Sequence, residues 1–441
     1  MGKDARLKLS FPLGLQGGED IAENPIEEEI MHRRKEEDAP SLKKDKTVSR
    51  RDFLKRTGTG LMGLGFGSFA ASCASTFSGN KQKLRGQAIP QARRGIRSSL
   101  SVPIIDIHRH CMPETSSMVG GLTRSITEMR MNLKETEGYS SATRKGITSI
   151  IYPEMRKINL QIQCQNEAGV TLSLLSFSMG LETLCQALFF APDKVVTRQF
   201  NDAMAKMVAE YPDKLAFMVA VNPSEQSSIE ECERCFKEHD AKGITIGTSW
   251  DGEFLNSQKI ESFWQYAQDR DVAIFLHPPF VPIGYSKMNI YRLEEMIGRP
   301  FDTTMTVACM IYSGVFDRHP GLKIVLPHMG AALPNIVGRL DFGYRLGYRG
   351  LAEREAAVCR KKPSEYFRTN LYVDTMGFNP LGVKYAIETF GIDHVLFGTD
   401  YAAVPISPRE HIDIVRNLGL SKTDEAKVLW ENANRIFNLG L

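Results

Sequence analysis

Four histidines and one aspartate in this chain have the residue types and spacing of a metal site. They are His108, His110, His277, His328 and Asp400. His108 and His110 are separated by one residue at the end of an apolar run, so strand alternation places both imidazoles on one side and Arg109 on the other. Imidazoles and a carboxylate suit Zn²⁺, with Mn²⁺, Fe²⁺ or Co²⁺ as other candidates, and leave a position for water or substrate.

Eight short apolar runs are interpreted as the strands that position these residues, because most are bounded by Gly, Pro or charged residues. The runs are Val102–Ile107, Gly169–Phe177, Lys214–Val221, Gly243–Gly247, Val272–Leu276, Leu322–Leu326, Leu371–Asp374 and Val395–Phe397. Helical patterns between them include Lys194–Glu210, Ser228–His239, Ser257–Arg270, Leu333–Tyr348 and Pro380–Phe390. Strand followed by helix, about eight times over, predicts an α/β fold, a (β/α)₈ TIM barrel.

An open doubly wound sheet is the alternative architecture. It predicts a glycine-rich phosphate loop after the first strand, where this chain has His108-Arg109-His110 instead. In a barrel the carboxyl ends of the strands form one rim, so the five candidate residues are expected to gather there. His319 and His394 precede their strands and are expected to be structural, and His239 and His411 lie in polar helical patterns outside the site.

The motifs around the five residues resemble those of the amidohydrolase-related family. They are Asp106-Ile107-His108-Arg109-His110, Leu276-His277-Pro278, Pro327-His328-Met329-Gly330 and Phe397-Gly398-Thr399-Asp400-Tyr401. The segment Gly243-Ile244-Thr245-Ile246-Gly247-Thr248 is similar to the branch of aminocarboxymuconate-semialdehyde decarboxylase. The resemblance covers about residues 102–438 and implies a barrel of the metal-dependent hydrolase type. It also implies one divalent metal held by His108, His110, His277 and Asp400, with His328 as general acid/base.

Two positions refine this resemblance. Binuclear members of the wider superfamily use a carboxylated lysine at the end of the fourth strand, but here Lys242 precedes that strand and Thr248 follows it. One metal is therefore expected. Relatives that decarboxylate hydroxybenzoates often carry a glutamate three residues after the catalytic histidine, and this chain departs from that pattern with Ala331.

The resemblance favours a non-oxidative decarboxylase of a small aromatic or unsaturated carboxylic acid, a reaction that needs no organic cofactor. A hydrolase of a lactone, amide or similar carbonyl compound is the alternative, because the same ligands would lower the pKa of a bound water toward about 7. An exported binding protein without catalysis is a third possibility. The same ligands serve decarboxylation and hydrolysis, so the metal motif does not distinguish these two reactions. The binding protein is disfavoured because no ligand position carries an inert residue.

The N-terminal part of the chain has the order of an export signal. Ser49-Arg50-Arg51-Asp52-Phe53-Leu54-Lys55 precedes the uncharged, glycine-rich run Thr57–Ser72, as in substrates of the twin-arginine export machinery. We expect a disordered extension at 1–48, the signal at 49–75, a linker at 76–100 and the barrel at 101–441, in an exported, periplasmic protein. Cys73 is a candidate lipid anchor, ordinary cleavage near Ala71 is the alternative, and Met31 is an alternative start.

Charge and cysteine content exclude other classes. The 55 Lys and Arg against 52 Asp and Glu give a net charge of +3, which argues against a nucleic-acid binder. The eight cysteines are scattered, unlike those of a disulfide-stapled module. Cys232-x-x-Cys235 lacks a second ligand pair, so we interpret it as part of an ordinary helix.

The interval 111–168 is longer than an ordinary loop and is expected to form a lid or pocket wall. Its basic side chains are candidate ligands for a substrate carboxylate, although solvated surface is the default interpretation of each. They are Arg124, Arg130, Lys134 and Arg144. Asp374 and Thr375, at the end of the seventh strand, are placed to line the pocket, and the aromatic stretch Phe342–Tyr348 is a candidate homodimer contact.

Overall fold

A computed structural model describes residues 102–111, 132–136, 139–144, 147–176, 193–250, 252–279, 282–288, 290–347 and 356–441. The export signal, Cys73, the linker, Arg124 and Arg130 lie outside the described residues. Of Lys134 and Arg144 the structure describes only the backbone. Within the described part of the chain, no helix is both long and apolar enough to cross a membrane.

Eight parallel strands form one sheet that closes on itself. They are β1 (Ile105–His110), β5 (Leu172–Ser176), β6 (Leu215–Ala220), β7 (Gly243–Gly247), β10 (Ala273–His277), β11 (Lys323–Leu326), β12 (Leu371–Asp374) and β13 (Val395–Leu396), hydrogen-bonded in that order. The amide of Ile107 donates to the carbonyl of Phe397 at 3.0 Å and that of His110 to the carbonyl of Tyr401 at 2.6 Å, which joins the first strand to the last. The predicted (β/α)₈ barrel is confirmed.

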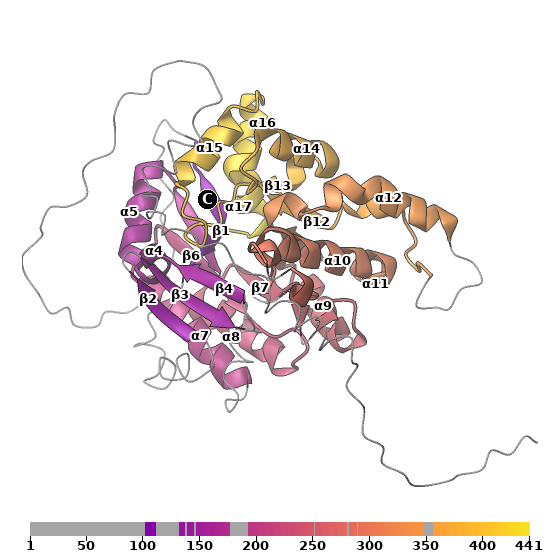
Figure 1. The fold of residues 1–441 in the computed structure, drawn as a ribbon, viewed down its shortest axis with the longest axis horizontal. Helices are drawn as coiled ribbons and strands as arrows, with labels where there is room; N and C mark the ends of the chain where they lie inside the picture. The colour runs from indigo at the N-terminus through magenta and orange to yellow at the C-terminus, as the bar shows by residue number, and fades with distance from the viewer. Residues whose placement is uncertain are drawn as a thin grey trace, which may run out of the picture. The chain divides into compact units, whose positions relative to one another are not determined.

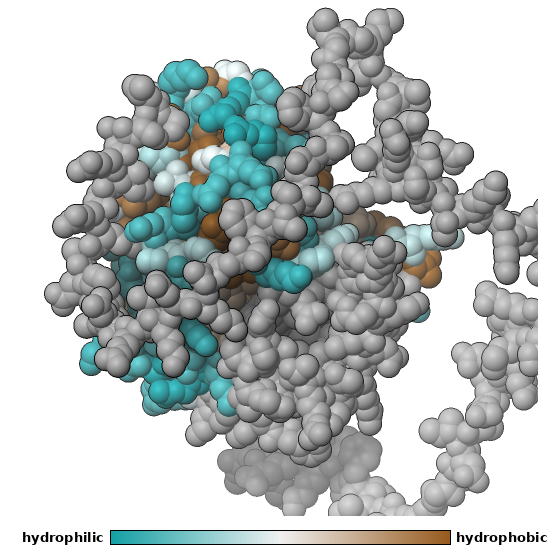
Figure 2. Space-filling model, turned by 90° about the vertical axis from the view of Figure 1, so that its left-hand side faces the viewer, coloured by the Kyte–Doolittle hydropathy of each residue, from teal (hydrophilic) through white to brown (hydrophobic). Residues whose placement is uncertain are grey.

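Helices follow the strands in chain order and surround them, from α5 and α7 in magenta to α14 and α15 in yellow (Figure 1). The helices are α4 (Pro153–Arg156), α5 (Ile158–Ala168), α7 (Asp193–Ala209), α8 (Ser227–His239), α9 (Glu261–Asp269), α10 (Arg299–Tyr312), α11 (Val315–Arg318), α12 (Leu333–Leu346), α13 (Pro363–Tyr366), α14 (Pro380–Phe390), α15 (Pro408–Arg416), α16 (Lys422–Ala426) and α17 (Asn432–Ile436). Each predicted helical pattern overlaps one of them, and α7 and α8 begin one residue earlier than predicted. The described residues on the face in Figure 2 are mostly hydrophilic, as expected when helices turn their apolar sides to the barrel.

Two smaller sheets are antiparallel. One consists of β2 (Asn132–Thr136), β3 (Tyr139–Arg144) and β4 (Ile147–Ile151), and the other of β8 (Ser249–Trp250) and β9 (Glu253–Phe254). The first connection of the barrel, predicted as a lid or pocket wall, therefore contains a sheet of its own together with α4 and α5.

The barrel interior is apolar below the rim. Inward side chains of the strands, Ile105, Ile107 and Phe275 among them, form one cluster with Ile436 and Phe437 at the end of the chain. A Cβ on Gly243, the first residue of β7, would lie 2.9 Å from the Phe437 ring. The C-terminal helix thus closes the amino-terminal mouth of the barrel and leaves the opposite rim for chemistry.

Strand β1 contains an irregularity that determines the direction of the His108 and His110 side chains. Ile105 and Ile107 belong to the interior cluster, yet His108, next in the chain, also lies inside the barrel, with its ring 5.0 Å from that of Phe275, which alternation alone does not allow. The pairing register of β1 with β5 shifts between Asp106 and Arg109. Such a bulge turns the following side chains to the other face, which brings the histidine pair onto the inner side of the rim.

Candidate metal centre

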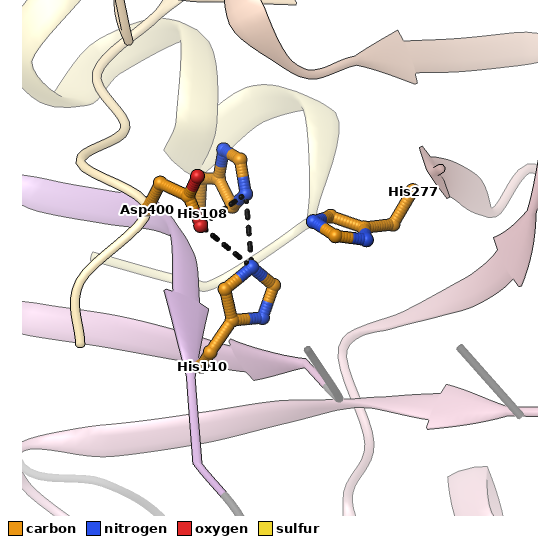
Figure 3. A group of neighbouring side chains, drawn as sticks. All are labelled: His108, His110, His277 and Asp400. Carbon is orange, nitrogen blue, oxygen red and sulfur yellow. Dashed lines mark hydrogen bonds and ion pairs between the residues drawn. The ribbon is translucent and has the colours of Figure 1, made fainter. Parts of the chain in front are cut away.

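The structure brings all five sequence-predicted site residues together at the carboxyl ends of the strands. His108 and His110 are on β1, His277 is the last residue of β10, His328 follows β11, and Asp400 follows β13. In Figure 3 the side chains of His108, His110, His277 and Asp400 point toward one common point. One ligand atom from each of these four lies within 4.8 Å of the others, and all four side chains are buried.

The distances within the group suit a small cation. Nε2 of His110 lies 2.9 Å from Oδ1 of Asp400, and Nε2 of His108 lies 3.3 Å from the same oxygen. The two Nε2 atoms are 3.1 Å apart. Since ligand atoms about 2.0–2.2 Å from a divalent metal are separated by roughly 3 Å, these spacings fit one metal in a tetrahedral or more open shell.

The buried nitrogen of His277 tests whether the residues fit a metal. Its Nδ1 lies 3.0 Å from the carbonyl of Pro278, which leaves Nε2 to face the group. That Nε2 is buried and has no hydrogen-bond partner among the described residues. A buried lone pair of this kind costs about 1–3 kcal/mol unless it is satisfied, and a divalent cation would satisfy it.

The protonation states of three of the four candidate ligands also suit metal binding. Burial lowers the pKa of both His110 and His277, which keeps these imidazoles neutral. Burial opposes ionisation of Asp400, but His108 and the hydrogen bonds of its imidazole partners hold the pKa of this carboxyl well below its usual range. For His108 burial disfavours the cation, and the carboxylates of Asp400 and Asp374 outweigh it and raise the pKa to about 10. A metal must therefore displace a proton from His108.

Asp374, at the end of β12, is not one of the four candidate ligands but supports them through hydrogen bonds. Its Oδ2 accepts a bond of 2.6 Å from Nδ1 of His108. Its Oδ1 accepts from the amides of Met329 at 2.9 Å and Met376 at 3.1 Å. The carboxylate thus orients one candidate ligand and also fixes the backbone beside His328.

The backbone at His328 and Asp400 is unusual. His328, Met329 and Ala331 have φ of 56°, 57° and 58°, and Asp400 has φ of 58°, a left-handed conformation that non-glycine residues rarely adopt. The amide of Asp400 donates to the carbonyl of His108 at 2.7 Å. Strained backbone of this kind persists where surrounding bonds fix it, and it clusters at functional sites.

Asp106 ties β1 to the loop that carries Asp400. Its carboxylate accepts from the hydroxyl of Thr399 at 2.7 Å and from the amides of Thr399 and His108, each at 3.2 Å. Burial raises the pKa of Asp106 to about 6, although the nearby Arg109 cation opposes this. The buried Arg109 points away from the centre, as predicted, and donates to Gln161 and Ser173 while lying over the Tyr401 ring.

At β7, where the bridging lysine was considered, the described residues place no lysine at the metal centre. Nζ of Lys242 pairs with Asp240 at 2.5 Å, before β7 begins. Beyond β7, the hydroxyl of Thr248 donates to Oδ2 of Asp302 at 2.6 Å. Cys232 and Cys235 are both buried within α8, and burial raises the pKa of both thiols, which supports the helical interpretation over a zinc site.

A cavity of about 610 Å³ opens over the metal centre. Its floor includes His277, His328 and Asp400, and Tyr152 and Met155 show that the first connection forms part of its wall. The other lining residues are Arg292, Glu295, Met296, Arg299, Pro300, Met329, Met376, Gly377, Phe378, Ala403, Val404 and Pro405. The volume of this cavity and its mixture of apolar, acidic and basic lining residues suit a small organic acid.

Two arginines of this cavity were missed by sequence reasoning, which placed its candidate cations in the first connection. Arg292 comes instead from the segment between β10 and α10, and Arg299 is the first residue of α10. The start of a helix at Arg299-Pro300 was the available signal, since proline favours the first helical turn. That signal marks a helix start but does not indicate a cavity.

His411 corrects a second expectation. It lies on α15 but is only 2% exposed, and its ring is 5.9 Å from that of Phe378 in the cavity wall. Burial lowers its pKa, while the charges of Asp374 and Asp400 oppose the shift. His411 therefore lies behind the site and not on a polar helix surface. His319 and His394, by contrast, bond to Glu261 and to the carbonyl of Leu371, in the structural roles expected of them.

Sequence comparisons agree with this geometry. A model of the amidohydrolase family matches residues 105–439. The chain is 30% identical over 308 residues to a gamma-resorcylate decarboxylase from a Polaromonas strain, covering 65% of this chain and 91% of the relative. It is 28% identical over 249 residues to a 2-amino-3-carboxymuconate-6-semialdehyde decarboxylase from Dictyostelium discoideum, covering 55% of this chain and 67% of the relative.

Solved structures share the barrel. A 5-carboxyvanillate decarboxylase from Sphingomonas paucimobilis aligns with a TM-score of 0.64 and 24% identity, covering 77% of this chain and 99% of that one. A dihydroxybenzoic acid decarboxylase from Polaromonas was solved with manganese and the inhibitor 2-nitroresorcinol. It aligns with a TM-score of 0.60 and 24% identity, covering 77% of this chain and 98% of that one. At this level of identity the likeness supports the fold.

Proposed function

Because this chain belongs to the amidohydrolase family, we propose that it is a metal-dependent non-oxidative decarboxylase of a small aromatic or unsaturated carboxylic acid. The observation that carries the proposal is the 30% identity to a decarboxylase that the chain covers over 91% of its length. The site is consistent with it, since His328 and the candidate metal ligands His277 and Asp400 lie on one cavity floor.

The metal would be held by the three neutral imidazoles of His108, His110 and His277 and by the carboxylate of Asp400. When bound, it supplies Lewis-acid stabilisation of negative charge on the substrate. Zn²⁺ suits the ligand set, and the Polaromonas neighbour was solved with manganese, so Zn²⁺ and Mn²⁺ are the leading candidates, ahead of Fe²⁺ and Co²⁺.

His328 is the proposed general acid. Its Nε2 lies 3.3 Å from Oδ2 of Asp400, and the residue lines the cavity. In the reaction the bond between the substrate carbon and its carboxylate breaks, CO₂ leaves, and the electron pair remains on the carbon. That carbon then takes a proton from His328, and a water molecule later returns the proton to the imidazole.

A panel of aromatic and unsaturated acids, lactones and amides tests the proposal on the metal-loaded protein. The expected result is release of CO₂ together with a product in which a hydrogen replaces one carboxylate of the acid. Turnover of lactones or amides without CO₂ release from any acid would instead identify a hydrolase. Absence of turnover across the panel, with the metal in place, would favour a binding protein.

We further propose that the twin-arginine motif at Arg50-Arg51 directs export of the folded, metal-loaded enzyme to the periplasm, with Cys73 as the candidate lipid attachment point. Fractionation of cells expressing the full chain and its Arg50→Lys, Arg51→Lys variant tests export, and intact mass of the product distinguishes lipidation from simple cleavage. A precursor that includes residues 1–30 would exclude the start at Met31. Retention of the wild-type chain in the cytoplasm would contradict export.

The exposed face of α12 supports a homodimer as a further proposal. Phe342 and Leu346, four residues apart on this helix, are 47% and 48% exposed and form an adjacent apolar pair on its surface. Sedimentation of the purified protein tests this: a dimer that becomes a monomer in the Phe342→Ser variant is expected, and a wild-type monomer would contradict the proposal.

A further inference from the structure

Helix α10 carries buried polar side chains that bond to loops of the barrel rim. Asp302, Thr304 and Thr306 are among them. Oγ1 of Thr304 accepts a hydrogen bond of 3.1 Å from the amide of Ala332, close to His328 in the chain. A buried polar group is costly unless it is hydrogen-bonded, so bonds of this kind fix the loops to the helix.

Asp302 bonds to both sides of the segment that carries His277. Its Oδ2 accepts from the hydroxyls of Thr248 at 2.6 Å and Ser249 at 2.8 Å. Its Oδ1 accepts from the amide of Ile283, six residues after His277, at 2.9 Å. The amide of Thr248 in turn donates to the carbonyl of His277 at 3.1 Å. One buried carboxylate therefore connects α10 to the end of β7, beside His277, and to the chain that follows this histidine.

His277 depends on its own backbone for its orientation more than His108 does. Nδ1 of His108 bonds to Asp374 on another strand. Nδ1 of His277 lies 3.0 Å from the carbonyl of Pro278, its neighbour in the chain. A partner one residue away moves together with the histidine and does not fix it to the barrel. The backbone on either side of His277 must therefore set the direction in which its Nε2 points.

We propose that Asp302 is a positioning residue of the metal centre, which holds the backbone around His277 so that Nε2 points toward the other three candidate ligands (Figure 3). The inference rests on the ligand role given to His277 in the proposed function, but not on the reaction catalysed. Residues that orient metal ligands in this way typically contribute about 10- to 100-fold to metal affinity. Metal affinity is therefore the property that the proposal changes.

Competition with a chelator for Zn²⁺ measures this affinity. We expect Asp302→Asn to lower it about 10-fold, because the amide offers one accepting oxygen where the carboxylate offers two. Thr248→Val has nearly the shape of threonine without its hydroxyl and should lower the affinity by a smaller factor. Should Asp302→Asn not fold, Thr248→Val carries the test alone. Wild-type affinity in the folded variants would overturn the proposal.

Thr306→Val on the same helix is the matched control. It removes a buried hydroxyl that accepts from the amide of Leu255 at 3.0 Å, a residue that is not beside a candidate ligand in the chain. This variant should unfold at lower denaturant, as Asp302→Asn does, but keep the Zn²⁺ affinity of the wild type. Equal losses of affinity in Thr306→Val and Asp302→Asn would make Asp302 a structural residue only and would overturn the proposal.

The visible absorption of the Co²⁺-loaded protein adds a readout that reduced stability alone does not change, because these bands depend on the geometry of the ligands. They should shift in Asp302→Asn and remain as in the wild type in Thr306→Val, and unchanged bands in Asp302→Asn would contradict the proposal. His277→Ala separates this inference from the proposed function. Unchanged Zn²⁺ affinity in His277→Ala would contradict the ligand set, whereas reduced affinity there with wild-type affinity in Asp302→Asn would overturn only the role of Asp302.

Discussion

Oδ2 of Asp374 lies 2.6 Å from Nδ1 of His108, and both side chains are fully buried. The bond leaves Nε2 of His108 to face Asp400, 3.3 Å away. A carboxylate behind a metal-binding imidazole fixes its ring orientation and increases its basicity. This pair therefore links the end of β12 to the candidate ligand on β1.

Asp374→Asn should weaken metal binding while preserving the fold. The amide has the shape of the carboxylate but lacks its charge, and loss of such a partner reduces metal affinity about 10- to 100-fold. Chelator competition measures the affinity. Asp393→Asn, which alters a largely exposed carboxylate paired with Lys427, is the matched control and should leave the affinity unchanged. Equal affinities of the Asp374 variant and the wild type would contradict the role given to this bond.

His328→Gln should reduce CO₂ release by at least about 100-fold without loss of metal, because general acid catalysis contributes roughly 10²- to 10⁴-fold. His239→Gln on α8 is the control, since His239 bonds to Arg234 and Asp202 far from the cavity lining. Turnover number and metal content are measured on the same preparations. A variant that loses its metal would make His328 a ligand, which is a different assignment from the one made above.

Metal binding should release about one proton between pH 7 and 9. In the metal-free protein the pKa of His108 is raised to about 10, above its ordinary value of 6.5, so the imidazole is protonated in this window and must lose its proton to the metal. Affinity should therefore rise about tenfold per pH unit until the pH approaches 10. Calorimetry in two buffers of different ionisation enthalpy measures the proton. Binding without proton release at pH 8 would contradict this account of His108.

Gly398→Ala should disturb the site through packing. A Cβ at this position would lie 2.8 Å from Cβ of His108 and 3.0 Å from Cβ of Asp374, closer than real contacts allow. Overpacking of this kind costs about 1–3 kcal/mol of unfolding free energy, and here it would also separate the two bonded residues and lower metal affinity. Gly338→Ala on α12, where a Cβ meets nothing within 4 Å, should instead stabilise the protein slightly. Denaturant unfolding distinguishes the two.

The strands and the site residues could be predicted because their determinants are local. A single intervening residue places His108 and His110 on one side, and the rule that barrel sites lie at strand ends adds His277, His328 and Asp400. Apolar runs bounded by turn residues marked all eight strands. The helix bounds differed at some ends, as for α12, which stops at Leu346 and not at Tyr348.

The remaining features depend on packing between segments distant in the chain. Alternation correctly placed the histidine pair opposite Arg109, but the bulge in β1 depends on pairing with β5 and has no local signal. His411 looked like a residue of a polar helix, but it is buried, and its ring lies 5.9 Å from that of Phe378, in another loop. Arg299 lines the cavity together with residues that follow β11, β12 and β13. None of these contacts follows from periodicity.

Elemental analysis of the native protein, together with its Asp400→Ala variant, tests the central claim most directly. The account predicts one divalent metal per chain in the wild type, since four ligand atoms from His108, His110, His277 and Asp400 converge and, in the described part of the chain, β7 supplies no lysine to bridge a second ion. The variant should lose both metal and activity. Two metals per chain, no metal in active protein, or an Asp400→Ala variant with unchanged metal and activity would contradict the site.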